Sequence, residues 1–578
     1  MRIENKSYQS SSKEKLLAEI ERLKKELKKR KKYGLVWEEE KHKEDVVEMC
    51  KEKLPILKEI KNKAIVTDKD KPINLLIEGD NYHSLSVLNY THVGKIDVIY
   101  IDPPYNTGSN KWIYNNKYID SEDEFRHSKW LSFMSKRLKL ARNLLKDNGV
   151  IIVTIDDYEI HSLGLLMDEI FGEHNRMSIL LIESNPRGRT SNAFFATSHE
   201  YYLFYGKNAS KCKIENLPLN EEQIAVFKHK DEISYYRLLP LRKSGAASRH
   251  NDRPKQFYPI YVNKNNLELS LTKLSNDWIE ILPIDESNEE RVWKLGRVNC
   301  EKYIKSCDVI AEKGRAGIRL FQKDRIKLGR KPKTLWIDPK YDSSAHGTNL
   351  IAEILGKRNI FDYPKSLYAV IDSLKTIILR NKNALILDFF TGSGTTGHAV
   401  LELNKEDDGN RQFILCTNNE NNNGNSYKIA EDICYPRLKK VIEGYKNLKG
   451  EWVEGLGGNL KYFKTDFVDA EPTDKNKKKL TDQAIEMLCI KEGTFEIVLE
   501  RTHFKIFKNN NHYAGIILDQ LVIPEFKKVI KDINGKFSIY VFSLSDETFD
   551  EEFSDIKQKI KLSPIPETIL KVYRRIFK

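Results

Sequence analysis

Short apolar runs recur along the chain, and each ends in a polar or glycine-rich segment. The runs occupy residues 74–77, 97–101, 150–155, 384–387 and 412–416. Patterns typical of helices lie between them, including an amphipathic one that opens at residues 130–134. Buried strands that alternate with helices predict an open α/β fold with a mainly parallel sheet. Such folds bind their ligands at the carboxyl ends of the strands, so the segments after the apolar runs are the candidate functional loops.

The run at 97–101 leads directly into Asp102, Pro103, Pro104 and Tyr105. Two consecutive prolines fix the backbone and remove two N–H donors, so the loop is stiff and its carbonyls are free to accept hydrogen bonds. A carboxylate and an aromatic face beside these acceptors could hold the amino group and stack the ring of a nucleobase pulled out of a helix. For the tetrapeptide taken alone, a surface proline turn is the alternative.

A second loop follows the run that ends at Asp388. Its glycines at 392, 394 and 397 have the G-x-G-x-x-G spacing that lets a backbone approach a cofactor at a strand-to-helix turn. A phosphate-binding NTPase loop would need Lys and a hydroxyl residue where His398 and Ala399 stand.

Two cofactors remain for the glycine loop. A nicotinamide cofactor fits the glycines and Glu420, which follows the next apolar run, but it leaves the proline loop unexplained. S-adenosylmethionine explains both loops, because Asp388 can face its cationic amino group while Glu420 accepts from the ribose hydroxyls. The sequence therefore favours S-adenosylmethionine.

Together the two loops resemble the motifs of amino-methylating DNA methyltransferases. The string from Asp102 to Gly108, DPPYNTG, resembles their catalytic motif, and it precedes the glycine loop by 392 − 102 = 290 residues, the permuted order of the β group. Residues 33–38, 455–465 and 564–570 resemble the methylation subunit of type III restriction-modification systems. The resemblance thus spans nearly the full chain.

This resemblance implies an α/β, Rossmann-like S-adenosylmethionine-dependent methyltransferase sheet in circularly permuted motif order, with an inserted target-recognition domain and an extra C-terminal α/β domain. The expected divisions are an N-terminal helical arm (1–70), a catalytic half (71–205), the recognition domain (206–350), a cofactor-binding half (351–450) and a C-terminal domain for subunit association (451–578).

The resemblance also implies the site residues. Asp102, Pro103, Pro104 and Tyr105 are expected to act on N6 of an adenine flipped out of double-stranded DNA. The residues expected at the cofactor are Asp80, Thr107, Phe361, Lys365, Asp388, Phe389, Thr391, Gly392, Gly394, Thr395 and Glu420. His199 and Glu200, on a further strand pattern, are assigned no chemistry.

Several alternatives stay open for the activity and the partners. Asp at the first motif position favours adenine, whereas N4 of cytosine presents the same amino geometry. A solitary methyltransferase and a non-catalytic DNA-recognition subunit are the other possibilities. The resemblance implies a separate restriction subunit with ATPase and nuclease functions, and a second copy of this chain in a homodimer.

Charge supports a polyanionic partner. The formal net charge is +13, and residues 228–255 carry eight basic against three acidic side chains, 8 − 3 = +5, with aromatic residues interleaved. Because this segment lies between the two motifs, we expect phosphate and base contacts from Arg242, Lys243, Arg249 and Arg253. An ordinary solvated basic face is the alternative.

The remaining patterns limit the class of protein. No apolar run reaches the ~18 residues of a membrane helix, and the first residues are polar, so a cytoplasmic protein is expected. The seven cysteines form no C-x-x-C pair, and no metal site is predicted.

Two further local patterns stand outside the methyltransferase motifs. A short heptad seam on a basic helix consists of Leu16, Ile20, Leu23 and Leu27. The set Asp519, Glu525 and Lys527 resembles a nuclease motif, but an acid-rich helix start is the favoured interpretation.

Overall fold

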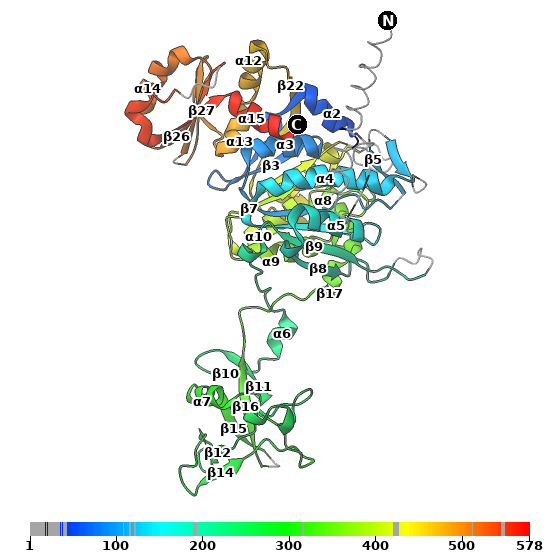
Figure 1. Ribbon diagram of the computed structural model, residues 1–578, viewed down its shortest axis with the longest axis vertical. Coiled ribbons are helices and arrows are strands. Elements are labelled where there is room, and N and C mark those ends of the chain that lie inside the picture. Colours follow the sequence, from blue (N-terminus) through cyan, green and yellow to red (C-terminus); the bar gives the residue numbers. More distant parts are fainter. Residues whose placement is uncertain are drawn as a thin grey trace, which may run out of the picture. The chain divides into compact units, whose positions relative to one another are not determined.

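The chain divides into two compact units, whose elements are labelled in Figure 1. The larger contains the residues up to 215 and those from 333 onward, and the smaller contains residues 216–332. The computed structural model describes residues 18, 20, 35, 37, 43–107, 109–114, 117–120, 123–188, 194–314, 317–419, 427–510, 512–544 and 549–577. Glu420 and, except for Ile20, the predicted heptad seam lie outside these residues.

The larger unit is built on one long sheet with strand order β1-β22-β3-β19-β18-β4-β7-β9-β8-β17. Their bounds are β1 (Lys53–Glu59), β22 (Asn459–Asp469), β3 (Ile73–Glu78), β19 (Gln412–Thr417), β18 (Leu385–Asp388), β4 (Ile96–Ile101), β7 (Leu145–Ile155), β9 (Glu200–Gly206), β8 (Arg176–Ile182) and β17 (Leu335–Trp336), and β2 (Ile65–Val66) pairs with β22. Adjacent strands from β22 to β7 are parallel, whereas β9 is antiparallel to both β7 and β8. The carboxyl ends of β3, β19, β18, β4 and β7 therefore lie at one edge of the sheet.

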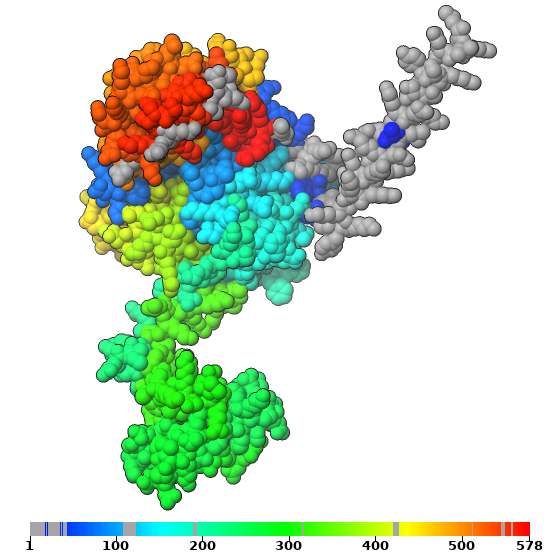
Figure 2. Space-filling view, turned by 60° about the vertical axis from the view of Figure 1, so that its left-hand side comes forward, coloured from blue at the N-terminus to red at the C-terminus, as the bar shows by residue number. Residues whose placement is uncertain are grey.

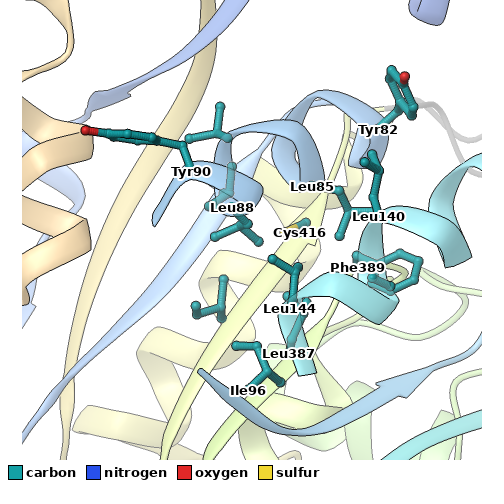
Figure 3. Close-up of a cluster of buried hydrophobic side chains, with 14 of the residues drawn as sticks. Tyr82, Leu85, Leu88, Tyr90, Ile96, Leu140, Leu144, Leu387, Phe389 and Cys416 are labelled. Carbon is teal, nitrogen blue, oxygen red and sulfur yellow. The ribbon is translucent and has the colours of Figure 1, made fainter. Parts of the chain in front are cut away.

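Helices cover the sheet because its strands are apolar on both faces. Three of them, α3 (Asn81–Thr91), α4 (Arg126–Leu144) and α5 (Ile160–Phe171), pack side by side. Leu85 and Leu88 of α3 and Leu144 of α4 meet Leu387 and Phe389 in the cluster of Figure 3. The other helices of this unit include α8 (Asn349–Leu355), α9 (Leu367–Ile378), α10 (Thr395–Asp407) and α11 (Tyr435–Glu443), and α9 packs on α10. The predicted α/β fold is confirmed.

The C-terminal part adds a second sheet to the larger unit. Its strands, in spatial order, are β23 (Glu496–Glu500), β24 (Phe504–Asn509), β25 (His512–Ile517), β26 (Lys536–Phe542) and β27 (Ile560–Ile565). The helices of this part are α12 (Asp474–Gln483), α13 (Ile485–Glu492), α14 (Ile523–Lys531) and α15 (Glu567–Ile576). Helices α13 and α15 pack on α3, and β22 is hydrogen-bonded into the central sheet. The sequence-based boundary at 451 therefore separates segments that form one compact unit here.

The smaller unit, green in Figures 1 and 2, contains two small antiparallel sheets. One consists of β10 (His229–Lys230), β11 (Tyr235–Pro240), β16 (Gly317–Arg325) and β15 (Val309–Gly314), and the other of β13 (Leu269–Ser270), β12 (Ile260–Asn263) and β14 (Trp278–Ile281). Helices α6 (Glu221–Ala225) and α7 (Arg297–Lys305) complete it. Leu241, Tyr258, Ile260 and Trp293 are buried together. This unit, residues 216–332, is narrower than the recognition domain predicted at 206–350.

No helix within the described residues is both long enough and apolar enough to cross a membrane.

Candidate active site

Asp102 follows β4 at the carboxyl edge of the sheet. Its Oδ1 accepts a 2.6 Å hydrogen bond from the hydroxyl of Thr154, on the adjacent strand β7. The side chain is 28% exposed, so an incoming group can still reach the carboxylate. Burial raises the pKa of Asp102, whereas the nearby ammonium of Lys365 lowers it.

The two prolines differ in what their carbonyls contact. The Pro104 carbonyl accepts a 2.7 Å hydrogen bond from the indole Nε1 of Trp130, at the buried side of α4. Pro103 is also buried, but no residue in the described part of the chain donates to its carbonyl. Of the two carbonyls, that of Pro103 thus stays available to accept a hydrogen bond, whereas that of Pro104 holds the loop on α4.

The loop then turns sharply through Asn106. Asn106 has a φ of +56°, and its Nδ2 donates to Glu159 Oε1 over 2.6 Å. Glu159 is fully buried, and the same oxygen contacts Nδ1 of His127 at 2.6 Å. Thr107 follows in a half-buried position. These contacts fix the chain on the far side of the proline pair.

Tyr105 is held by a polar cluster whose members come from distant segments. Its hydroxyl donates to Glu200 Oε2 at 3.3 Å, and Lys365 Nζ donates to the same hydroxyl. The ammonium lies 4.5 Å from the centre of the Tyr105 ring and 3.1 Å from Asp102 Oδ1. Sequence reasoning put Lys365 at the cofactor and gave Glu200 no chemistry, but the structure brings both to the proline loop.

Asp388 ends β18, the strand next to β4. Its carboxylate accepts from the Phe390 N–H at 2.9 Å and from the Thr396 hydroxyl at 2.6 Å. The side chain is buried, and burial raises its pKa to about 7. The negative charge of Asp102 contributes to this rise of the pKa, whereas the two hydrogen bonds oppose it. No Lys, Arg or His side chain in the described part of the protein contacts this carboxyl group, so it is well suited to a cationic ligand.

The glycine loop leaves room where side chains would fill it. Gly392 has a φ of +52°, and a Cβ there would lie 3.0 Å from Cζ of Phe361. Gly394, at φ +84°, is the residue before α10, and Thr391 Oγ1 donates to the Asp388 carbonyl at 2.8 Å. Phe361 and the loop therefore lie close together, although they come from different segments.

Phe389 and Thr395 contact the protein interior. The Phe389 side chain is buried in the core, and its carbonyl accepts from Asn81 Nδ2 at 3.1 Å. The Thr395 hydroxyl accepts from Arg437 Nη1 at 2.8 Å. Arg437 lies on α11, is fully buried and also donates to Ser393 Oγ at 3.0 Å. Burial lowers the pKa of Arg437 to about 10. Sequence reasoning missed this residue, because nothing in its local pattern distinguishes it from a surface arginine of a helix.

Asp80, another predicted cofactor residue, caps helix α3. Its Oδ1 accepts from the Tyr82 N–H at 2.7 Å and lies 3.5 Å from the guanidinium of Arg137. Arg137 is fully buried and also pairs with Glu44 at 2.6 Å. The Asp80 carboxylate is one-quarter exposed, so it keeps a face toward solvent.

The predicted DNA-contacting residues of the smaller unit differ in how exposed their side chains are and in whether they are paired. Arg242 pairs with Glu286 at 2.9 Å and donates to the Ile284 carbonyl. Arg249 and Arg253 are exposed, whereas Lys243 is half-buried. Exposed guanidinium groups are more available to phosphates than the paired one.

Two expectations about other chemistry concern the C-terminal part and metals. Asp519 caps a short 3-10 turn, Glu525 pairs with Arg501, and Lys527 pairs with Asp555 at 2.5 Å. The three nuclease-like residues are therefore engaged with other partners. Within the described residues, no group of three His, Cys, Asp or Glu side chains could hold a metal ion.

The sheet, the proline loop and the glycine loop define an open α/β protein whose two loops meet at neighbouring parallel strands. A family profile described as DNA methylase matches residues 96–422, more than half of the chain. The chain therefore belongs to the DNA methylase family, and its sheet is the Rossmann-like methyltransferase sheet that the sequence predicted.

Characterised relatives were also found. The Type III restriction-modification enzyme EcoPI Mod subunit of Escherichia phage P1 is 33% identical over 64% of this chain and 62% of its own length. The Type II methyltransferase M.KpnI of Klebsiella pneumoniae is 34% identical over 68% of this chain and 93% of its own length. The StyLTI Mod subunit of Salmonella typhimurium is 29% identical over 67% and 59%. The chain thus spans less than two thirds of the two Mod subunits.

Solved structures with similarity to the chain include the M1.HpyAVI-SAM complex, with 13% identity, a TM-score of 0.28, and coverage of 63% of this chain and 98% of that one.

Proposed function

We propose that this chain is a site-specific DNA methyltransferase that moves a methyl group from S-adenosylmethionine to N6 of adenine. The observation that carries the proposal is the adjacency of Asp102 and Asp388 at the ends of neighbouring parallel strands. They are close enough for the charge of one to affect the pKa of the other. One acceptor site for an amino group and one for a cationic cofactor therefore lie side by side.

The cofactor half fits S-adenosylmethionine in three respects. The buried Asp388 carboxyl can balance a positive charge, Gly392 keeps the backbone of the loop free of a side chain, and Phe361 supplies an aromatic ring next to it. Thr391 and Gly394 shape the loop, and Asp80 has its carboxylate partly exposed at the end of β3. When bound, S-adenosylmethionine supplies an electrophilic methyl group on a cationic sulfur.

The chain's own residues act on the target base. An adenine flipped from duplex DNA would stack on Tyr105 while its amino group donates to the Asp102 carboxylate and the Pro103 carbonyl. Thr154 and Lys365 both approach Oδ1 of Asp102, so Oδ2 is the oxygen that faces the target. Hydrogen bonds accepted from both N–H groups of the amino group draw the nitrogen lone pair out of conjugation with the ring. As the N–CH3 bond forms and the S–CH3 bond breaks, the nitrogen gives up one proton. The protein thus contributes positioning and electrostatic stabilisation.

Replacing the acceptor tests this assignment. We expect Asp102→Ala to abolish transfer of tritiated methyl groups to DNA, while calorimetry shows cofactor affinity within about threefold of the unsubstituted protein. Near-normal transfer by this variant would rule out the assigned site. Sequencing of modified bases in DNA from cells that express the chain distinguishes N6-methyladenine from N4-methylcytosine and gives the target sequence.

We further infer that the chain is the modification subunit of a type III restriction-modification system, acts in the cytoplasm as a homodimer and joins a separate restriction subunit. The similarity to the EcoPI and StyLTI Mod subunits supports this inference. A solitary methyltransferase is the second candidate, because the match to M.KpnI covers 93% of a type II enzyme. Copurification of the tagged chain with the product of the adjacent gene distinguishes the two, and light scattering gives the number of copies.

A further inference from the structure

Two buried, oppositely charged side chains, Lys365 and Glu200, accompany Asp102 and take no part in binding the target base as proposed above. Lys365 lies in the segment before α9, and Glu200 is the first residue of β9. Lys365 Nζ is 2.9 Å from Glu200 Oε2 and 3.1 Å from Asp102 Oδ1. The side chains of Lys365 and Glu200 are only 8% and 7% exposed. One ammonium therefore bridges two carboxylates.

The bridge closes a ring of polar contacts around the proline loop. Lys365 donates to the hydroxyl of Tyr105, which donates to Glu200 at 3.3 Å. Thr154 completes the ring, at 3.4 Å from the Tyr105 hydroxyl and 2.6 Å from Asp102. Both ends of the loop, the acceptor carboxylate and the aromatic ring, are thus fixed by the same ammonium.

The charges in this ring do not cancel. Two carboxylates and one ammonium leave one net negative charge in a largely buried place. Two carboxylates this close cannot both stay ionised without a cation, and the one that takes a proton can no longer accept at that oxygen. The Asp388 carboxyl, at the end of the neighbouring strand β18, adds a further acidic group near Asp102, and Tyr100 and Tyr202 are the buried phenols nearby.

We propose that Glu200 and Lys365 are a positioning pair for methyl transfer: Lys365 keeps Asp102 ready to accept the target amino group, and Glu200 holds Lys365 in place. This inference rests on the proposed function of Asp102. It assigns Lys365 to the target base and not to the cofactor, and it gives Glu200 a role that its strand pattern did not indicate.

The charges of Lys365 and Glu200 influence the pH above which methyl transfer becomes fast. Transfer requires the Asp102 carboxylate, so the rate rises with pH through the pKa of this group. Removing the Lys365 charge takes away a group that lowers this pKa, so the acid limb of the rate profile moves to higher pH. Removing the Glu200 charge takes away a group that raises it, so the limb moves to lower pH. The two substitutions therefore shift the profile in opposite directions.

The experiment measures single-turnover methyl transfer to a cognate duplex from pH 5 to 9 for Lys365→Met, Lys365→Arg and Glu200→Gln in the full chain. We expect the acid limb of Lys365→Met to rise by about one to three pH units, the range for losing an opposite charge at this distance. Its rate at pH 7 should fall at least about tenfold, and its cofactor affinity should change less than about threefold. In Lys365→Arg the acid limb should return to the pH found for the unsubstituted protein. In Glu200→Gln it should move to lower pH.

A matched control separates a positioning role from a structural one. Lys461 and Glu59 form a similarly buried ion pair between β22 and β1, with side chains 15% and 14% exposed. Lys461→Met should lower thermal stability as Lys365→Met does but leave the acid limb unchanged. An unshifted limb in Lys365→Met and Glu200→Gln would overturn the proposal, as would a loss of cofactor affinity of tenfold or more in Lys365→Met. If Lys365→Met does not fold, the other two variants still decide: the acid limb of Glu200→Gln should move to lower pH, whereas that of Lys365→Arg should stay where it lies in the unsubstituted protein. An unshifted limb in Glu200→Gln would then overturn the proposal. Normal transfer by Asp102→Ala would instead refute the proposed function itself.

Discussion

The indole nitrogen of Trp130 donates a 2.7 Å hydrogen bond to the carbonyl oxygen of Pro104. This contact joins the buried side of α4 to the proline loop, and it takes up one of the two carbonyls that the double proline leaves without a local donor. The neighbouring Pro103 carbonyl accepts no hydrogen bond from the described residues, and we propose that it is the acceptor that acts beside Asp102. The position of the proposed amino-group acceptor thus depends on a hydrogen bond from helix α4.

Trp130→Phe tests this support. The substitution keeps most of the packing of a fully buried side chain but removes the donor, which costs about 0.5–1.5 kcal/mol. We expect single-turnover transfer to fall roughly two- to tenfold. Trp336→Phe is the matched control, since Trp336 is also buried and donates to the Lys333 carbonyl at 2.8 Å. Equal rates in the two variants would contradict this role of Trp130.

Gly392→Ala should weaken binding of S-adenosylmethionine. A Cβ at this position meets the Phe361 ring at 3.0 Å, and the φ of +52° is strained for a residue with a side chain, by about 1–2 kcal/mol. We expect the dissociation constant measured by calorimetry to rise at least about tenfold, and more for Gly392→Val. Gly164→Ala, on α5, is the control, because a Cβ there meets nothing within 4 Å. Undiminished binding of S-adenosylmethionine by Gly392→Val would show that this loop is not part of the cofactor site.

Binding of the cofactor should release a proton near neutral pH. Burial raises the pKa of Asp388 to about 7, whereas a cationic ligand favours its carboxylate. We therefore expect affinity to increase with pH up to about 7 and then level off. Calorimetry in buffers of different ionisation enthalpy measures the released proton, and Asp388→Asn should eliminate it. An affinity that is independent of pH between 5.5 and 7.5 would argue against a cationic group at Asp388.

The raised pKa of Asp388 also affects the folding stability of the ligand-free protein. Stability should fall as the pH rises, whereas cofactor affinity should increase. In the unfolded chain an Asp loses its proton at about pH 4, whereas folded Asp388 keeps it to about pH 7. The folded state therefore binds more protons between these values, and its stability falls as the pH rises through this window. Denaturant unfolding of the ligand-free protein should show this decline, and Asp388→Asn should reduce it. A stability that rises over this range in both proteins would show that other groups dominate.

The basic segment of the smaller unit should bind DNA through its exposed arginines. We expect Arg249→Ala and Arg253→Ala each to weaken binding to all duplexes and to reduce the slope of log K against log salt by about 0.9. Arg242→Ala should lower the stability of this unit as well, because Arg242 pairs with Glu286. Lys449→Ala, at an exposed turn of the larger unit, is the control. Unchanged affinity and slope in Arg249→Ala and Arg253→Ala would show that this segment is an ordinary solvated face.

The alternative for these arginines is direct base recognition. If one of them reads a guanine edge, its loss should instead cost about 1–3 kcal/mol of binding free energy at one base position.

Local sequence was sufficient to predict those features of this protein that depend only on neighbouring residues in the chain. An apolar run followed by Asp102 and two prolines predicts a strand that ends in a stiff acceptor loop, whatever surrounds it. The glycines at 392 and 394 predict a turn between a strand and a helix, and both lie between β18 and α10 with positive φ angles. The alternation of strands and helices indicated the α/β class for the same reason, since each element follows from its own periodicity.

Tertiary structure decided which side chains meet at these loops. Lys365 contacts Asp102 and Glu200 because its segment returns to the sheet edge after the smaller unit, and local periodicity does not encode that return. Arg437 reaches the glycine loop for the same reason. Strand order is set by how apolar faces pack across the whole unit, so contacts between distant segments emerge only when the sheet is assembled. The sequence by itself thus determined the proline loop and the glycine loop, and the tertiary structure alone determined the charges that surround them.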